Sequence, residues 1–265
     1  MTNETELIHF PAHIMDIAAI NKVASDLINH CLTLTLRLTR LDEGDRSPVG
    51  AASGFLVSLE GSTYLISAGH ALAKGVWVIE TDMIVESECR TACIPVNGAW
   101  IIKRLTFGKS ELESVDVSWA KIDLEEFQKG VRVHKQISGK PFEFMVYQGA
   151  FGETPQPQTT YIYASQNRVV IFEALGKRHL ERQPSYELEL EYTGRKTRQG
   201  LFVFSIPEHK GHPHYKGASG APIIDPTGQI FAILVGGCEI SNELYGYPLW
   251  DVPNLIRIGE ESLKR

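Results

Sequence analysis

Short runs of alternating apolar and polar residues, separated by turn residues, dominate this sequence from residue 31 onward. In the run 31–41, four leucines at every second position alternate with threonine and arginine. This period of two predicts a strand with one buried face. Similar runs follow between glycine, proline and asparagine residues, among them GFLVSLE, STYLISA, DVSWAKI, TYIYA, YELELEY, LFVFSI and QIFAILVGG. Such a series predicts an all-β protein built as a sandwich or a pair of barrels.

The two ends of the chain carry helical patterns instead. In the segment 14–30, apolar residues recur at spacings of three and four, at Ile17, Ile20, Ala24, Leu27 and Ile28. We therefore expect an amphipathic helix that docks on the body of the protein. The tail 251–265 predicts a short closing helix, with Asp251 as its candidate cap and Pro253 in its first turn.

Length and composition limit the architecture and the partners. A chain of 265 residues suits two small domains or one β-rich unit built in halves. Hydrophobic residues make up 43% of it and charged residues 22%, which allows a packed core and excludes a disordered chain. The net charge of −6 predicts neither nucleic acid nor an anionic membrane as a partner. A polar stretch at 126–141 could hold the crossing between two halves.

The sequence also bears on the environment of the protein. The first residues, MTNETELIHF, lack the basic and apolar regions of a secretory signal. No apolar run approaches the ~20 residues that a membrane-spanning helix needs. The four cysteines, Cys31, Cys89, Cys93 and Cys238, are fewer than a secreted barrel of this size usually has. We expect reduced thiols and a cytoplasmic protein, with export after removal of a signal as the alternative.

A serine among small residues is the candidate nucleophile. Ser219 lies in the sequence KGASGAPIID, with glycine and alanine on both sides. On a tight turn with exposed backbone, the amides of Gly217 and Ser219 could point at one carbonyl oxygen and stabilise an oxyanion. An ordinary glycine-alanine turn between strands is the alternative interpretation.

A histidine and an aspartate could activate that serine. His70 ends the apolar run STYLISAGH, and imidazole can both accept and donate a proton near neutral pH. Asp116 precedes the apolar run 117–122, and a shielded carboxylate there could fix the tautomer of the ring. Asp123 is a rival for that role, and both aspartates could instead cap turns.

Taken together, these segments resemble the chymotrypsin-like (trypsin-like) serine peptidases of the bacterial and intracellular branch. The resemblance spans residues 53–237 and is carried by SGFLV, YLISAGH, DVSWAKID, GASGAP and GQIFAILVGG. It implies two packed six-stranded antiparallel β-barrels with the site between them. We accordingly divide the chain into an N-terminal helical extension (1–30), an N-terminal barrel (31–130) and a C-terminal barrel with the closing helix (131–265).

The resemblance also implies residue roles. His70 would act as general base and then general acid, Asp116 would orient it, and Ser219 would attack the peptide carbonyl. The amides of Gly217 and Ser219 would form the oxyanion hole. Val235, Gly236 and Gly237 would pair with the substrate backbone beside the primary specificity pocket. The expected function is that of a serine endopeptidase with a polypeptide substrate, no cofactor and no metal.

Several departures from the family pattern leave other functions open. Ala221 replaces a usual glycine and is tolerable only if its φ is negative. Val235 replaces a serine that would support the carboxylate of Asp116. These two changes favour a peptide-binding pseudo-peptidase as the alternative. Ala218 stands where an acidic residue would allow activation by chain cleavage. A latent effector protease that recruits a regulatory protein through the segment 14–30 is a third hypothesis.

The specificity pocket is the least defined part of the sequence. Pro213 occupies the position where an acidic residue would imply a preference for arginine or lysine. The loop 209–215 holds His209, His212 and His214. They could line the pocket and favour an acidic substrate residue, or bind a metal. We favour a solvated polar loop over both, with Pro213 and His214 as the candidate substrate contacts.

Overall fold

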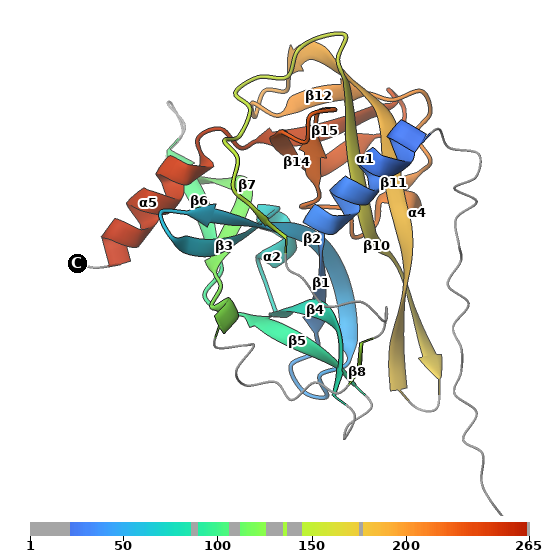
Figure 1. The fold of residues 1–265 in the computed structure, drawn as a ribbon, viewed down its shortest axis with the longest axis vertical. Coiled ribbons are helices and arrows are strands. Elements are labelled where there is room, and N and C mark those ends of the chain that lie inside the picture. Colours follow the sequence, from blue (N-terminus) through green and yellow to red (C-terminus); the bar gives the residue numbers. More distant parts are fainter. Residues whose placement is uncertain are drawn as a thin grey trace, which may run out of the picture.

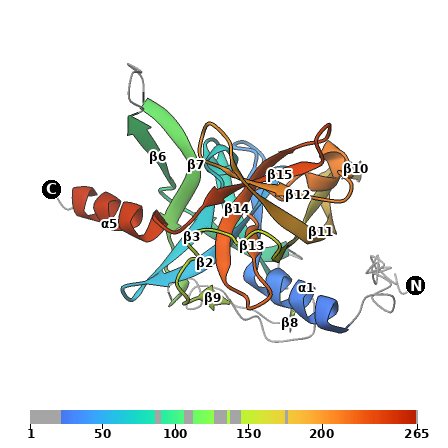
Figure 2. The ribbon, with the colours of Figure 1, turned by 90° about the horizontal axis from the view of Figure 1, so that it is seen from above.

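A computed structural model describes residues 22–85, 90–105, 112–125, 135–136, 145–174 and 177–263. The protein is built mainly of strands, which form two sheet systems packed side by side (Figures 1 and 2). The first half contains β1 (Leu36–Leu41), β2 (Pro48–Leu59), β3 (Ser62–Ser67), β4 (Val76–Val85), β5 (Arg90–Val96), β6 (Trp100–Leu105), β7 (Leu112–Lys121), β8 (Lys135–Gln136) and β9 (Val146–Tyr147). The second half contains β10 (Thr160–Ala174), β11 (Lys177–Lys196), β12 (Phe202–Ser205), β13 (Pro222–Ile224), β14 (Ile230–Cys238) and β15 (Glu243–Pro248). The helices are α1 (Lys22–Leu34), α2 (Gly69–Leu72), α4 (His212–Tyr215) and α5 (Val252–Leu263).

The second half is the six-stranded antiparallel barrel that the sequence predicts. Its strands close in the order β10-β11-β12-β15-β14-β13. Aromatic rings fill its interior with edge contacts, such as Tyr161 on Phe204 and Tyr192 on Phe202. Such arrangements suit the quadrupoles of the rings and bury a large apolar area per residue.

The first half differs from the expected six-stranded barrel. Its nine described strands follow an open path, β5-β4-β1-β2-β3-β7-β6, with β8 added to β4 and β9 added to β2. Strand β9 can join because β2 is long and changes partner along its length: Pro48–Gly54 pairs with β1, and the part beyond it with β3 and β9. The change occurs at Gly54, where a Cβ atom would lie 2.8 Å from the carbonyl oxygen of Ile66.

Helix α1 extends further along the chain than the sequence predicts. We expected residues 31–34 to begin the first strand, but the helix continues to Leu34 and β1 starts at Leu36. The reason is a second periodicity, because Ile28, Cys31 and Leu34 lie on one helical face and are buried. The hydroxyl of Thr35 closes this end, because its oxygen lies 2.8 Å from the carbonyl oxygen of Cys31 and 2.9 Å from that of Ala164, and its one proton can be donated to either. Residues 14–21 of the expected helix lie outside the described residues.

Each terminal helix covers the half of the molecule that is distant from it in sequence. Helix α1 packs on β10 of the second half, whereas α5 packs on the first half (Figure 1). The predicted closing helix is thus confirmed, and Gly259 allows it to approach closely, since a Cβ there would lie 2.7 Å from the Trp119 ring. The carboxylate of Asp251 accepts a hydrogen bond from the side-chain amide of Asn254.

The two halves share one apolar core. Phe55, Ile66 and Trp119 of the first half belong to the same buried cluster as Ile162 and Ile233 of the second. Burial of this shared surface fixes how the halves sit on each other. Most of the predicted crossing at 126–141 lies outside the described residues, as does Cys89.

Among the described residues, no helix combines the length and the apolar character needed to cross a membrane. Cys31, Cys93 and Cys238 are free thiols. Burial raises the pKa of the Cys31 thiol to about 12, so this cysteine behaves as part of the apolar core.

Candidate active site

His70 and Asp116 come together within the first half of the molecule. His70 lies in the single turn α2 that follows β3, and Asp116 lies in β7, the neighbour of β3. The Nδ1 atom of His70 is 2.9 Å from Oδ1 and 3.0 Å from Oδ2 of Asp116. The backbone amide of His70 donates to the same carboxylate at 2.9 Å. The rival Asp123 lies beyond the end of β7 and is exposed.

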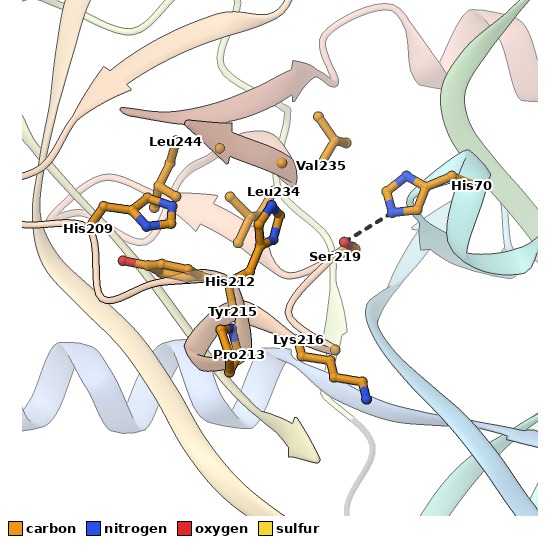
Figure 3. Close-up of a pocket in the computed structure, with 13 residues that line it drawn as sticks. His70, His209, His212, Pro213, Tyr215, Lys216, Ser219, Leu234, Val235 and Leu244 are labelled. Carbon is orange, nitrogen blue, oxygen red and sulfur yellow. Dashed lines mark hydrogen bonds between the residues drawn. The ribbon is translucent and has the colours of Figure 1, made fainter. Parts of the chain in front are cut away.

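Ser219 reaches this pair from the second half. It lies in the turn before β13, and its Oγ is 3.1 Å from Nε2 of His70 (Figure 3). The structure therefore brings His70 together with Asp116, which is 46 residues away along the chain, and with Ser219, which is 149 residues away. A hydroxyl, an imidazole and a carboxylate in this order can pass a proton from the hydroxyl to a stabilised imidazolium.

The electrostatics of the pair suit proton transfer. The hydrogen bond that His70 donates to the Asp116 carboxylate raises the pKa of His70 above its ordinary value, against the opposing effect of burial. Burial alone would raise the pKa of Asp116, but hydrogen bonds from the side chain and amide of His70 and from the Gly69 amide hold it below its usual value. Asp116 thus stays ionised at neutral pH and stabilises a protonated His70.

Two backbone amides beside Ser219 are free to bind a ligand. Around them, the amides of Ala218, Gly220 and Ala221 donate to carbonyl oxygens of the protein at 2.8 to 2.9 Å. The amides of Gly217 and Ser219 donate to no acceptor in the described part of the chain. Both residues line the cavity next to His70. Two such amides beside a hydroxyl can stabilise the oxyanion of a tetrahedral intermediate by donating hydrogen bonds to it.

A type II turn holds these amides in position. Lys216 has φ −61° and ψ 121°, and Gly217 has φ 88°, values typical of the two central residues of such a turn. The turn is closed by a hydrogen bond of 2.9 Å from the Ala218 amide to the Tyr215 carbonyl. The positive φ requires a glycine at 217.

Ser53 on β2 of the first half fastens this turn from across the interface. Its hydroxyl donates to the Gly217 carbonyl oxygen at 2.9 Å, and its amide donates to the Ser219 carbonyl oxygen at 2.8 Å. The Ser67 hydroxyl in turn donates to the Ser53 carbonyl at 2.6 Å. Ser53 belongs to a sequence motif of the candidate family, but nothing in the sequence signals this contact.

The residues after Ser219 fit the close approach of the two halves. Gly220 has φ 93°, and a Cβ atom there would lie only 2.0 Å from the Ser53 carbonyl oxygen. Ala221, in contrast, is fully buried and does not have a positive φ. The methyl group that departs from the family pattern therefore causes no backbone strain.

A cavity of 610 Å³ opens beside Ser219 and extends into the second half (Figure 3). Four of the predicted substrate contacts line it: Val235, Gly236, Gly237 and Pro213. His209 and His212, which the sequence interpretation named as pocket residues only in an alternative that it did not favour, also line the cavity. It did not name the other lining residues Tyr215, Lys216, Leu234 and Leu244.

The structure does not place His214 in the cavity wall, and the loop 209–215 makes specific contacts with the body of the protein. The Nε2 atom of His214 lies 3.8 Å from the Glu187 carboxylate, and His214 is not among the described residues that line the cavity. The α4 turn separates it from His212, because residues two apart on a helical turn point in different directions. His209 is buried, with 9% of its surface exposed. Within the described part of the chain, no three metal-ligating side chains form a group.

Comparison with known proteins places the fold. No protein-family model and no curated protein matches the sequence. Neuropsin, a serine protease expressed in the limbic system of mouse brain, superimposes with a TM-score of 0.51 over 87% of this chain and 96% of its own, at 13% identity. A serine endoprotease from Yersinia pestis matches 88% of this chain and 65% of its own, with a TM-score of 0.45 and 10% identity. At such low identity the likeness to neuropsin concerns the fold, and the chain therefore has the chymotrypsin-like fold of two packed β-barrels, with the first of them open among the described strands.

Proposed function

We propose that this protein is a serine endopeptidase that cleaves peptide bonds through an acyl-enzyme on Ser219. The observation that carries the proposal is the position of one imidazole between two partners. The Nε2 of His70 lies 3.1 Å from the Ser219 hydroxyl, while its Nδ1 lies 2.9 Å from Asp116. The chymotrypsin-like fold adds support, because it places both halves around that point.

The proposed reaction follows from these contacts. His70 accepts the hydroxyl proton as Ser219 Oγ attacks the substrate carbonyl carbon. Asp116 stabilises the imidazolium, and the amides of Gly217 and Ser219 donate to the oxyanion. His70 then returns the proton to the leaving amine, and the carbon–nitrogen bond breaks. A water molecule, deprotonated by His70 in the same way, releases the acyl group and restores the serine.

An open strand edge next to the cavity offers a place for the substrate backbone. The pairing of β14 with β13 ends at Ile233, opposite Pro222. On the other side, Gly236 and Gly237 remain paired with β15. Among the described strands, none pairs with 235–237 on the side that β13 has left. A substrate in extended conformation could add to this edge through main-chain hydrogen bonds.

The features that favoured a silent peptide-binding protein do not weaken the site. Ala221 avoids a positive φ, as described above. The loss of a serine at Val235 leaves Asp116 with the backbone amides of Gly69 and His70 as donors. Two expectations from the sequence stay predictions. One is a regulatory partner that binds through the N-terminal helix, and the other is a cytoplasmic location.

Labelling with a fluorophosphonate probe tests the proposal directly. The wild-type protein should react at one serine, and Ser219→Ala should abolish both labelling and peptide hydrolysis, the latter by at least about 10⁴-fold. Ser58→Ala on β2 is the matched control and should label like the wild type. Labelling that persists in Ser219→Ala, or a wild-type protein that never reacts, would refute the proposed function.

A further inference from the structure

The end of the cavity opposite Ser219 is formed by the imidazole of His209 (Figure 3). Between these two ends the exposed imidazole of His212 also lines the cavity, and the remaining walls are largely apolar. Leu234, Leu244 and the ring of Tyr215 form them, and Gly236 and Gly237 add no side chain. The cavity therefore leads from Ser219, past apolar residues and the exposed His212 ring, to the buried imidazole of His209.

The surrounding structure fixes both the position of the His209 ring and its tautomer. The Gly211 amide donates to Nδ1 at 3.1 Å, so Nδ1 acts as an acceptor and the neutral ring carries its proton on Nε2. The backbone amide of His209 donates to the Asn242 side chain at 2.9 Å. The ring also packs against Tyr215, with 4.6 Å between the centroids. His209 is thus a preorganised hydrogen-bond donor.

The Nε2 atom of His209 is directed to the cavity wall at Gly237. A Cβ atom on Gly237 would lie 3.2 Å from Nε2, so the glycine leaves this nitrogen accessible. Nε2 has no hydrogen-bond partner among the described residues, and it is not one of their fully buried unsatisfied atoms. A donor in such a place gains most from a ligand that brings an acceptor into the cavity.

The charges around the cavity favour an anionic acceptor. None of the 13 described residues that line it is an aspartate or a glutamate, and Lys216 lies at the entrance near Ser219. The nearby carboxylate of Glu187 is already bound by Lys210 at 2.9 Å and by the Tyr215 hydroxyl at 2.9 Å. Because that hydroxyl donates to Glu187, Tyr215 presents its ring to the cavity rather than a polar group.

We propose that this cavity receives the substrate side chain that precedes the cleaved bond and selects glutamate there. The glutamate carboxylate would accept a hydrogen bond from Nε2 of His209, while its methylene groups pack between Leu234, Leu244 and Tyr215. The inference rests on the proposed peptidase function, since it names the substrate class of the same site. It replaces the solvated loop that the sequence favoured for 209–215.

Matched peptides that differ only at this residue test the selectivity. With glutamate, glutamine, leucine and lysine at the position, we expect kcat/KM to fall in that order. Glutamine keeps the acceptor without the charge, so it separates the hydrogen bond from the attraction of Lys216. A preference for lysine or leucine over glutamate would overturn the proposal.

Substitution of His209 identifies the group responsible. His209→Leu removes the donor and should lower the glutamate-over-leucine ratio of kcat/KM by about 10- to 100-fold, the range for one hydrogen bond to a charged group. His209→Gln retains a donor and should restore part of the ratio. His214→Gln, in the same loop but outside the cavity, is the matched control and should leave the ratio unchanged. An unchanged ratio in His209→Leu would contradict the assignment.

Peptide binding to Ser219→Ala separates this inference from the proposed function. Calorimetry on this variant with the same four peptides measures the preference of the cavity without catalysis, and fluorophosphonate labelling of the wild type measures the nucleophile without a substrate side chain. If the glutamate peptide binds most tightly, the inference is supported even when labelling fails. A failure of labelling refutes only the proposed peptidase function. Normal labelling with no preference for glutamate, or no binding of any peptide, would refute the glutamate pocket alone.

Discussion

The two halves of the molecule contribute different parts of the candidate site. The open first half supplies the candidate base His70 and its partner Asp116, on adjacent elements. The closed second barrel supplies the candidate nucleophile Ser219, the two amides without an acceptor among the described residues, and most of the cavity. The His70 side chain is 50% exposed, whereas the residues that flank Ser219 in the chain, Ala218 and Gly220, are buried.

This difference shows that the contact between His70 and Ser219 depends on the interface between the halves. The distance from His70 Nε2 to Ser219 Oγ joins one half to the other, so packing must hold it. Close to the site, Ser53 of the first half binds the turn at Gly217. Elsewhere, Arg182 of the long β10–β11 hairpin binds Glu80 on β4 at 2.7 Å and Thr39 on β1 at 2.6 Å. The following variants remove these contributions one at a time.

Replacing the carboxylate of the first half should have the largest effect. Asp116→Asn keeps the shape but no longer stabilises the imidazolium, so we expect kcat/KM to fall by about 10⁴-fold. Steady-state hydrolysis of a good peptide substrate measures this loss. The control is Asp123→Asn, which should retain wild-type activity. Equal losses in the two variants would show that Asp116 has no special role.

Breaking the ion pair between the halves should mainly affect stability. Burial alone would raise the pKa of Glu80, but Arg182, with smaller contributions from Thr39 and Arg37, outweighs burial and holds the pKa low, so Glu80 is charged in the folded protein. Arg182→Met should therefore lower the free energy of unfolding by about 3 kcal/mol, measured by urea denaturation, because it leaves that charge poorly compensated. Adding Glu80→Leu should recover most of the loss. A single variant as stable as the wild type would show that the pair does not join the halves.

Removing the Ser53 hydroxyl should test its function as a positioning residue. Ser53→Ala deletes the hydrogen bond to the Gly217 carbonyl and should lower kcat by about 3- to 10-fold, the worth of one neutral hydrogen bond, while KM changes little. Ser58→Ala, on the same strand, should change neither constant. If KM rises while kcat stays constant, Ser53 contributes to substrate binding instead of to the turn.

The pH dependence should report the pairing within the first half. Only neutral His70 can accept the proton, and Asp116 raises the pKa of His70 above its ordinary value. Activity should thus be complete above the raised pKa and fall as the pH drops through it, at a pH above about 6.5. In Asp116→Asn, the midpoint of the residual activity should move to lower pH. A midpoint that stays in place would mean that another group controls the profile.

The strand pattern was largely predictable, and its main error is informative. Leu32 and Leu34 alternate with threonines, which satisfies the period of a strand. Ile28, Cys31 and Leu34 satisfy a helical spacing over the same residues. The sequence alone cannot choose between the two, because the choice depends on contacts with Ala164, more than 120 residues away. The open first sheet was equally hidden, since no local pattern shows that β2 changes partner at Gly54.

Within the candidate site, residues with strong local signals were found and those defined by distant contacts were not. Small flanking residues mark Ser219, and the ends of apolar runs mark His70 and Asp116. Ser53 lies in a family motif and His209 in a histidine-rich loop, but neither pattern shows which group the side chain contacts. Their importance comes from what they face, a carbonyl of the other half and the inside of a cavity.

The sequence by itself determined the strand-rich architecture, the closing helix and the three candidate catalytic side chains, because these follow from periodicity and from the chemistry of residue types. Only the tertiary structure decided that His70 faces Ser219, that two amides are left without acceptors and that His209 closes the cavity. Such relations depend on the packing of segments far apart in the chain, and the free energy of that packing is distributed over the whole shared core rather than encoded in any one motif.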